Sequence, residues 1–105
     1  MEDYHKAIKN YDKAVKLAPK NINVYYNRGL VKGKLQDYSG AIQDYDKAIA
    51  LAPKMAAAYN NRGITNANLK DYAGAIADYN KAIELDPQNT DAYIFSGFAK
   101  RKLND

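Results

Sequence analysis

The sequence predicts an all-α fold in which antiparallel helix pairs stack in a row as a right-handed α-solenoid. The stretch DYSGAIQDYDKAI at 37–49 recurs 34 residues later as DYAGAIADYNKAI at 71–83, and a third version, DYHKAIKNYDKAV, occupies 3–15. The three prolines of the chain are separated by the same 34 residues. A fixed period of about 20–50 residues is typical of stacked repeat proteins, so the period outranks any local assignment of secondary structure.

Each repeat is predicted to contain two helices. Across 38–51 the apolar residues follow the three-and-four spacing of an amphipathic helix, and Pro53 cannot continue that helix. The stretch 22–35 is the first helix of the same repeat, and GKLQDY at 33–38 supplies the turn between the two helices. The sequence shows no sustained two-residue alternation of apolar and polar residues, which argues against strands.

A glycine recurs inside each predicted first helix, as Gly29 in the first complete repeat. Glycine in a helix interior costs about 1 kcal/mol relative to alanine, so its recurrence indicates that another backbone approaches closely. We expect the small residue at the equivalent place of the second helix, Ala41, to fill that contact. Tyr25 and Tyr45 are then expected near each other as the large residues around it.

Six places of the repeat carry a recognisable pattern. Aromatic residues occupy the fourth and twenty-fourth places, glycine the eighth, alanine the twentieth and twenty-seventh, and proline the thirty-second. In the two complete repeats these places hold Tyr25, Gly29, Ala41, Tyr45, Ala48 and Pro53, then Tyr59, Gly63, Ala75, Tyr79, Ala82 and Pro87. This pattern resembles the tetratricopeptide repeat (TPR), a helix–turn–helix unit of the same length.

The resemblance covers residues 1–105 as a single domain. We expect a half repeat with only a second helix at 3–21, complete repeats at 22–55 and 56–89, and a half repeat with only a first helix at 90–105. The array is expected to be cut within a repeat at both ends.

Two places depart from the family pattern. The seventh place, usually leucine, and the eleventh, usually aromatic, hold polar residues, which are Arg28, Arg62 and Ser96, then Lys32, Asn66 and Lys100. We expect a wetter seam between the helices of each pair, without a change of fold.

The charged residues are predicted to lie on solvated helix faces. The net charge of +4 is spread along the chain, and basic residues are dense only at 100–102, so a nucleic-acid partner is not expected. Asp44, Asp46 and Asp78 are expected on exposed faces of second helices, in local ion pairs with neighbouring lysines.

The residue content argues against catalysis, a cofactor or a bound metal. The chain has no cysteine, and its one histidine, His5, is expected at the surface with no partner at a spacing that would make it a base. Scattered carboxylates with one histidine make no metal-ligand cluster. No apolar run approaches about 18 residues and no secretory signal is visible, which excludes a membrane span and favours the cytoplasm without establishing the compartment.

The family resemblance implies a protein-interaction module whose first helices line a concave groove that binds a peptide or a helix. The candidate peptide-binding residues are Asn23, Tyr26, Asn27, Leu30, Lys34, Asn60, Asn61, Ile64, Asn68, Ile94, Phe95, Phe98 and Arg101. Asparagine amides offer a donor and an acceptor to a peptide backbone, and exposed apolar groups often mark interaction sites. For Leu30, Ile64 and Phe98 the alternative is that they pack first helix against first helix.

Some family members hold the terminal carboxylate of heat-shock chaperones with lysines, asparagines and an arginine from three first helices. The matching places in this chain hold Tyr26, Leu30, Asn61, Asp91 and Phe95. Only Asn61 fits that chemistry, and Asp91 would repel a carboxylate, so a chaperone-tail receptor is not expected.

Self-assembly is the second functional hypothesis. The two half repeats are expected to leave complementary unmatched faces, formed by Tyr4, Ala7, Tyr11, Ala14, Tyr93 and Gly97. The last helix of one molecule would then complete a repeat with the first helix of another, giving a swapped dimer, a ring or a filament. The alternative is an excerpt of a longer protein that stays monomeric.

Overall fold

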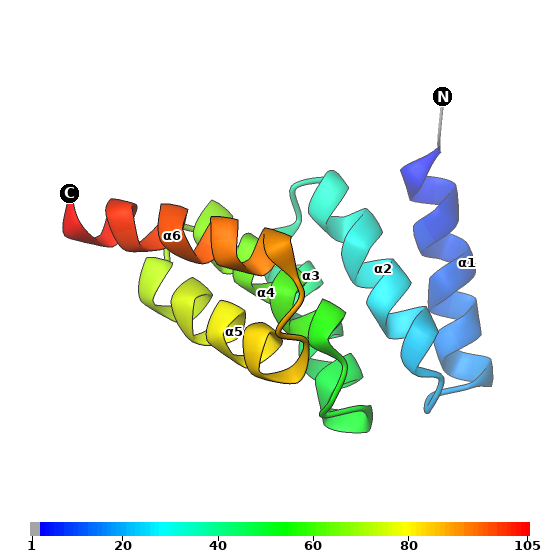
Figure 1. Ribbon diagram of the computed structural model, residues 1–105. Helices are drawn as coiled ribbons and strands as arrows, with labels where there is room; N and C mark the ends of the chain where they lie inside the picture. Colours follow the sequence, from blue (N-terminus) through cyan, green and yellow to red (C-terminus); the bar gives the residue numbers. More distant parts are fainter. Residues whose placement is uncertain (1–2) are drawn as a thin grey trace. The chain divides into compact units, whose positions relative to one another are not determined.

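The computed structural model describes residues 3–105, which form six α-helices and no strand (Figure 1). The helices are α1 (Tyr4–Leu17), α2 (Ile22–Lys34), α3 (Tyr38–Leu51), α4 (Ala56–Asn68), α5 (Tyr72–Leu85) and α6 (Thr90–Asn104). The all-α prediction is confirmed, and the helix expected at 38–51 has those bounds.

The chain divides into two compact units of three helices each. In the first unit α2 packs against both α1 and α3. In the second unit α5 packs against both α4 and α6, and α4 also contacts α6. Each unit therefore contains one complete helix pair and one additional helix.

A single aspartate shapes each turn inside a helix pair. The backbone N–H of Asp37 donates to the Lys32 carbonyl at 2.8 Å and closes the end of α2, with Gln36 in the left-handed region at φ 64°. The Asp37 carboxylate accepts from the Gly40 N–H at 3.1 Å and caps the start of α3. Asp71 does the same between α4 and α5, so this part of the repeated phrase encodes a turn and a helix start together.

The recurring glycine makes room for a tyrosine ring. A Cβ atom added at Gly29 would lie 2.7 Å from Cε1 of Tyr45, and one added at Gly63 would lie 2.7 Å from Cε1 of Tyr79. The expected close approach is confirmed, but the nearest neighbour is the ring and not the small residue of the second helix. In the second unit the Ala75 carbonyl oxygen is a more distant neighbour of the added Cβ, at 3.2 Å.

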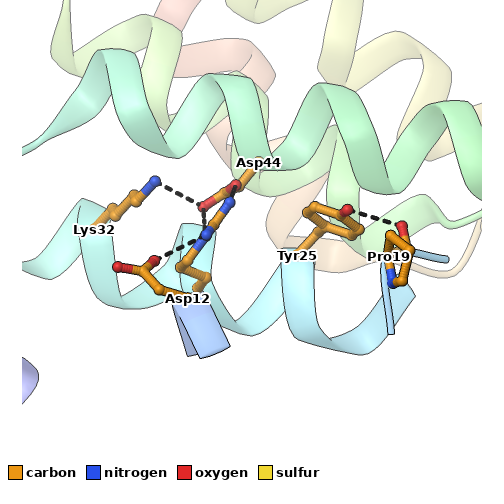
Figure 2. A network of polar contacts seen from close by, with 6 residues as sticks. Asp12, Pro19, Tyr25, Lys32 and Asp44 are labelled. Carbon is orange, nitrogen blue, oxygen red and sulfur yellow. Dashed lines mark hydrogen bonds and ion pairs between the residues drawn. The ribbon is translucent and has the colours of Figure 1, made fainter. Parts of the chain in front are cut away.

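Tyr25 and Tyr45 each have a neighbour that the sequence analysis did not predict. The Tyr45 ring tilts against Tyr26, with centroids 6.0 Å apart. Tyr25 is buried, and its hydroxyl donates to the Pro19 carbonyl at 2.8 Å (Figure 2). That bond connects α2 to the loop between α1 and α2.

A buried ion-pair network joins α2 to α3 (Figure 2). Arg28 donates through Nε and Nη2 to the two carboxylate oxygens of Asp44, at 2.9 and 2.7 Å, and through Nη1 to Asp12 of α1 at 2.9 Å. Lys32 Nζ lies 3.2 Å from the same Asp44 carboxylate. The hydrogen bond to Asp44 is the main reason that the pKa of Arg28 is raised.

The prediction that Asp44 is exposed was wrong, because only 3% of its surface is accessible. Its face of α3 turns toward α2, where Arg28 and Lys32 occupy the two places that depart from the family pattern. These departures supply counterions for a buried aspartate. The seam is a charged one, in which the Arg28 and Lys32 side chains stay partly exposed.

We predict opposite effects for the same substitution at three equivalent glycines. Gly29→Ala and Gly63→Ala should each lower the free energy of unfolding by about 1–3 kcal/mol, because a tyrosine ring must move. Gly97→Ala should raise it by about 1 kcal/mol, since an added Cβ there meets nothing within 4 Å and alanine favours a helix. Urea unfolding followed by far-UV circular dichroism measures all three, and equal losses would contradict the seating of the rings.

Candidate functional site

The second unit holds an open apolar cavity of about 190 Å³. Its lining comes from all three helices and consists of Ile64, Ala67, Asn68, Tyr72, Tyr79, Phe95, Phe98 and Ala99. We call it the α4–α6 cavity. Since cavities of about 150 Å³ hold benzene, this space accommodates an aromatic or aliphatic side chain.

An ion-pair network equivalent to that of the first unit fixes α4 on α5. Arg62 donates through Nε and Nη2 to the Asp78 carboxylate at 3.0 and 2.7 Å, and the Asn66 side-chain amide donates to it at 3.0 Å. Asp78 is buried, so its predicted exposure was also wrong, for the same reason as at Asp44. The network holds the α4 wall of the cavity in place.

Tyr79 connects the repeat core to the cavity. Its ring seats on Gly63 and also tilts against the Phe95 ring, with centroids 6.0 Å apart and an interplanar angle of 31°. Burial, with a smaller contribution from the Asp78 charge, raises the pKa of Tyr79 to about 12. The phenol is therefore neutral at physiological pH, and the cavity has an uncharged aromatic wall.

The α6 wall is unusual because its large apolar side chains are the exposed ones. Ala92, Ser96 and Ala99 are buried, whereas Ile94 is 58% and Phe98 is 56% exposed. The Arg101 guanidinium lies 5.8 Å from the centroid of the Phe98 ring, within the range of a cation–π contact. The cavity rim thus combines exposed aromatic surface with a positive charge.

The α4–α6 cavity brings together four of the candidate peptide-binding residues, Ile64, Asn68, Phe95 and Phe98. Arg101 stands over one of them, and Ile94 is exposed on the same helix without lining the cavity.

The asparagines of α4 are arranged differently from a row that faces a ligand. The Asn61 amide nitrogen donates to the Ala57 carbonyl of its own helix at 3.0 Å. The Asn60 side-chain oxygen is buried, with no hydrogen-bond partner among residues 3–105. Asn68 is the asparagine that reaches the cavity.

Four lining residues, Ala67, Tyr72, Tyr79 and Ala99, are not among the candidate peptide-binding residues. The 34-residue periodicity of the two tyrosines assigned them to the repeat core. Periodicity identifies a buried place but carries no information on whether that place also borders an open cavity.

A second cavity, of about 370 Å³, lies in the first unit between α1 and α2. We call it the α1–α2 cavity; its lining consists of Asp3, Tyr4, Ala7, Tyr11, Asn27, Leu30, Val31 and Lys34. It therefore combines three candidate peptide-binding residues with three candidate self-association residues. Of the remaining candidates, Asn23 is exposed, Ala14 is half-buried and Tyr26 packs on Tyr45.

The two cavities occupy the same place in the repeat. Tyr4, Tyr11 and Leu30 precede Tyr72, Tyr79 and Phe98 by 68 residues, which is two periods. In the second unit α4 contributes Ile64, Ala67 and Asn68 to the lining of the cavity.

Other kinds of site find no support in the described part of the chain. Within residues 3–105 no His, Asp and Glu side chains gather as three potential metal ligands. No helix among these residues has the length and apolar character that a bilayer crossing requires. His5 is exposed.

Family models match the chain in two places. A model described as tetratricopeptide repeat covers residues 26–90, and one described as TPR repeat covers residues 1–36. The chain belongs to the tetratricopeptide repeat family. The resemblance inferred from the sequence is confirmed.

Solved TPR structures share the fold at high similarity. The first TPR of Spaghetti (RPAP3) bound to the HSP90 peptide SRMEEVD is 28% identical with a TM-score of 0.94, covering 97% of this chain and 81% of that one. The Arabidopsis OM64 TPR domain is 33% identical with a TM-score of 0.90, covering 93% and 81%. The TPR2B domain of yeast Sti1, in a complex with pHsp70, is 26% identical with a TM-score of 0.89, covering 95% and 85%. Among curated protein sequences, none matches this TPR chain.

We predict that removing one partner of the Arg62–Asp78 pair destabilises the second unit, whereas replacing both partners with apolar residues does not. Asp78→Ala should lower the free energy of unfolding by about 3 kcal/mol, because it leaves Arg62 partly buried without its carboxylate. The double variant Arg62→Leu with Asp78→Leu, which restores the usual family leucine at the seventh place, should recover most of that loss.

Urea denaturation measures both variants of the pair. Glu84→Ala on the same helix is the matched control, since Glu84 is exposed and lies 3.6 Å from Lys81, and it should change stability by less than about 0.5 kcal/mol. An equal loss in the single and double variants would contradict this account of the pair.

Proposed function

We propose that the chain is a non-catalytic protein-interaction module that binds a peptide segment by seating an apolar side chain of the ligand in the α4–α6 cavity. The observation that carries this proposal is the open apolar cavity beside exposed Phe95 and Phe98. Ligand sites are concave and mostly apolar, with few polar groups, and this lining has that character.

The distribution of buried and exposed side chains on α6 supports ligand binding at its exposed face. The helix packs with alanine and serine and leaves Ile94, Phe95 and Phe98 in solvent, at 58%, 38% and 56% exposure. Of the three, Phe95 packs on Tyr79 of α5 but keeps more than a third of its surface exposed. Contacts within the unit therefore leave much of these three side chains uncovered. A contiguous exposed apolar patch of this kind marks an interaction surface.

The comparisons support peptide binding in general but not the chaperone tails named in them. Two of the similar TPR structures are complexes, one with an HSP90 peptide and one with pHsp70. In this chain Asp91 and Phe95 stand at two of the places where such receptors carry cations, and the Asn61 amide already bonds to Ala57. The proposed ligand is therefore recognised through an apolar side chain.

We predict that two residues on the cavity wall control peptide capture. Peptides selected by the chain from a random phage-displayed library should carry an apolar anchor. The double variant Phe95→Ala with Phe98→Ala should bind them at least about tenfold more weakly. Burying one large apolar side chain contributes about 1.5–3 kcal/mol of binding free energy, and the variant removes the surface that buries it.

Tyr93→Ala is the matched control for capture, since Tyr93 is 51% exposed on the same helix but does not line the cavity. Its peptide affinity should equal that of the unchanged chain. Fluorescence polarisation measures the affinities, and unchanged binding by the double phenylalanine variant would overturn the proposal.

Self-assembly is a second candidate, favoured by one specific observation. Gly63 seats the Tyr79 ring, whereas nothing lies within 4 Å of a Cβ added at Gly97, the equivalent glycine of α6. Tyr11, the equivalent of Tyr79, lines the α1–α2 cavity. We propose that α6 of one molecule enters the α1–α2 cavity of another and seats Tyr11 on Gly97, which produces rings, swapped dimers or filaments.

We predict that assembly depends on Gly97 and not on the peptide-binding phenylalanines. Light scattering of the 105-residue chain should show a mass that rises with concentration. Gly97→Leu should keep the mass at that of the monomer, because the added side chain occupies the seat of the ring, and a Cβ at this position has no atom of its own molecule within 4 Å. Phe95→Ala with Phe98→Ala should still assemble, and a constant monomer mass for the unchanged chain would overturn this candidate.

A further inference from the structure

One face of α6 carries opposite charges on either side of the cavity. Asp91, Phe95, Phe98 and Lys102 follow one another at helical spacings of four, three and four residues, which places them on the same face. Phe95 and Phe98 line the α4–α6 cavity. The face is therefore acidic before the cavity and basic after it, where Arg101 adds a second positive charge.

These charges are available to a ligand. Asp91, Arg101 and Lys102 are exposed, and Arg101 lies over the Phe98 ring. A helix rises about 1.5 Å per residue, so Asp91 and Lys102 are about 16 Å apart along α6. In an extended peptide the first and fifth residues are about 13 Å apart, at about 3.3 Å per step, and long charged side chains cover the remaining distance.

The same charges also complement the dipole of α6, a role that requires no ligand. The other two helices of the unit lack this arrangement, since neither α4 nor α5 has an acidic residue in its first turn or a basic residue in its last. Basic residues also end α1 and α2, but within residues 3–105 only α6 combines an acidic first turn with a basic last turn. The distinctive feature of α6 is that its charges flank a cavity.

We propose, resting on the peptide-binding function above, that the α4–α6 cavity selects an internal peptide segment in which an apolar residue lies between a basic and an acidic residue. The apolar side chain enters the cavity, the acidic side chain pairs with Arg101 and Lys102, and the basic side chain pairs with Asp91. A free terminal carboxylate is not needed, because the apolar side chain anchors the segment and flanking side chains supply the charges.

Three peptides with acetylated and amidated ends test the charge selection. Their sequences are Lys-Ser-Leu-Ser-Glu, Glu-Ser-Leu-Ser-Glu and Lys-Ser-Leu-Ser-Lys. Titration followed by NMR shifts of the α6 amides detects weak binding. The mixed peptide should bind about threefold to fivefold more tightly than either of the others, which is the range for one exposed ion pair. The preference should shrink as added salt screens the charges.

Charge reversal in the protein should reverse the ranking. Asp91→Lys should make Glu-Ser-Leu-Ser-Glu the tightest ligand, and Arg101→Glu with Lys102→Glu should make Lys-Ser-Leu-Ser-Lys the tightest. Lys100→Glu is the matched control, because residue 100 lies on a different face of the helix from the cavity lining. It should leave the ranking unchanged.

The outcomes separate this inference from the function on which it rests. Equal affinity for the three peptides, with binding lost when their leucine becomes alanine, overturns the charge selection and leaves peptide binding intact. Binding that does not depend on the leucine, or no binding by any peptide, overturns both. A free-carboxylate version of the mixed peptide that binds more than about tenfold tighter overturns the internal-segment requirement.

Discussion

The structure of each helix pair depends on a tyrosine ring that rests directly on glycine backbone. Because Gly29 and Gly63 have no side chain, the rings of Tyr45 and Tyr79 approach their partner helices closely. The resulting short separation brings an arginine of the first helix within bidentate reach of an aspartate sixteen residues later. The ring contact and the ion pair of each helix pair thus depend on the same close approach. The buried aspartates are tolerated because that approach holds an arginine beside each of them.

The same packing rule explains why apolar surface is exposed on α6. Helices in this chain approach one another through small residues, and α6 follows the rule by burying Ala92, Ser96 and Ala99. Its large side chains then stay partly in solvent, even where Phe95 packs on Tyr79 of α5. No atom lies within 4 Å of a Cβ added at Gly97, so contacts within the described unit do not account for this glycine. A cavity beside such a helix follows from how the repeat packs, and no special local distortion is needed to form it.

The sequence predicted the periodic features well and the features that join two helices less well. The helix at 38–51 and the close approach at Gly29 follow from local spacing, which a repeat preserves. The burial of Asp44 was not predicted, because within its own helix it has the spacing of a surface residue near lysines. The informative signal was a pairing, in which an arginine at the seventh place is followed sixteen residues later by an aspartate, and it recurs in both complete repeats. The sequence predicted only those lining residues of the cavity that are exposed. The remaining lining residues depend on how much of the helix pair the third helix covers, which local spacing does not show.

The arginines of the two complete first helices serve the packing of the repeat. Arg28 and Arg62 turn toward the second helix and neutralise buried aspartates, so they are engaged within the repeat. An arginine paired bidentately inside a helix pair cannot also bind a ligand without exposing an uncompensated carboxylate, which is costly. In the proposed recognition at the α4–α6 cavity, buried apolar area would supply the affinity, and the exposed charges of α6 would select the flanking residues.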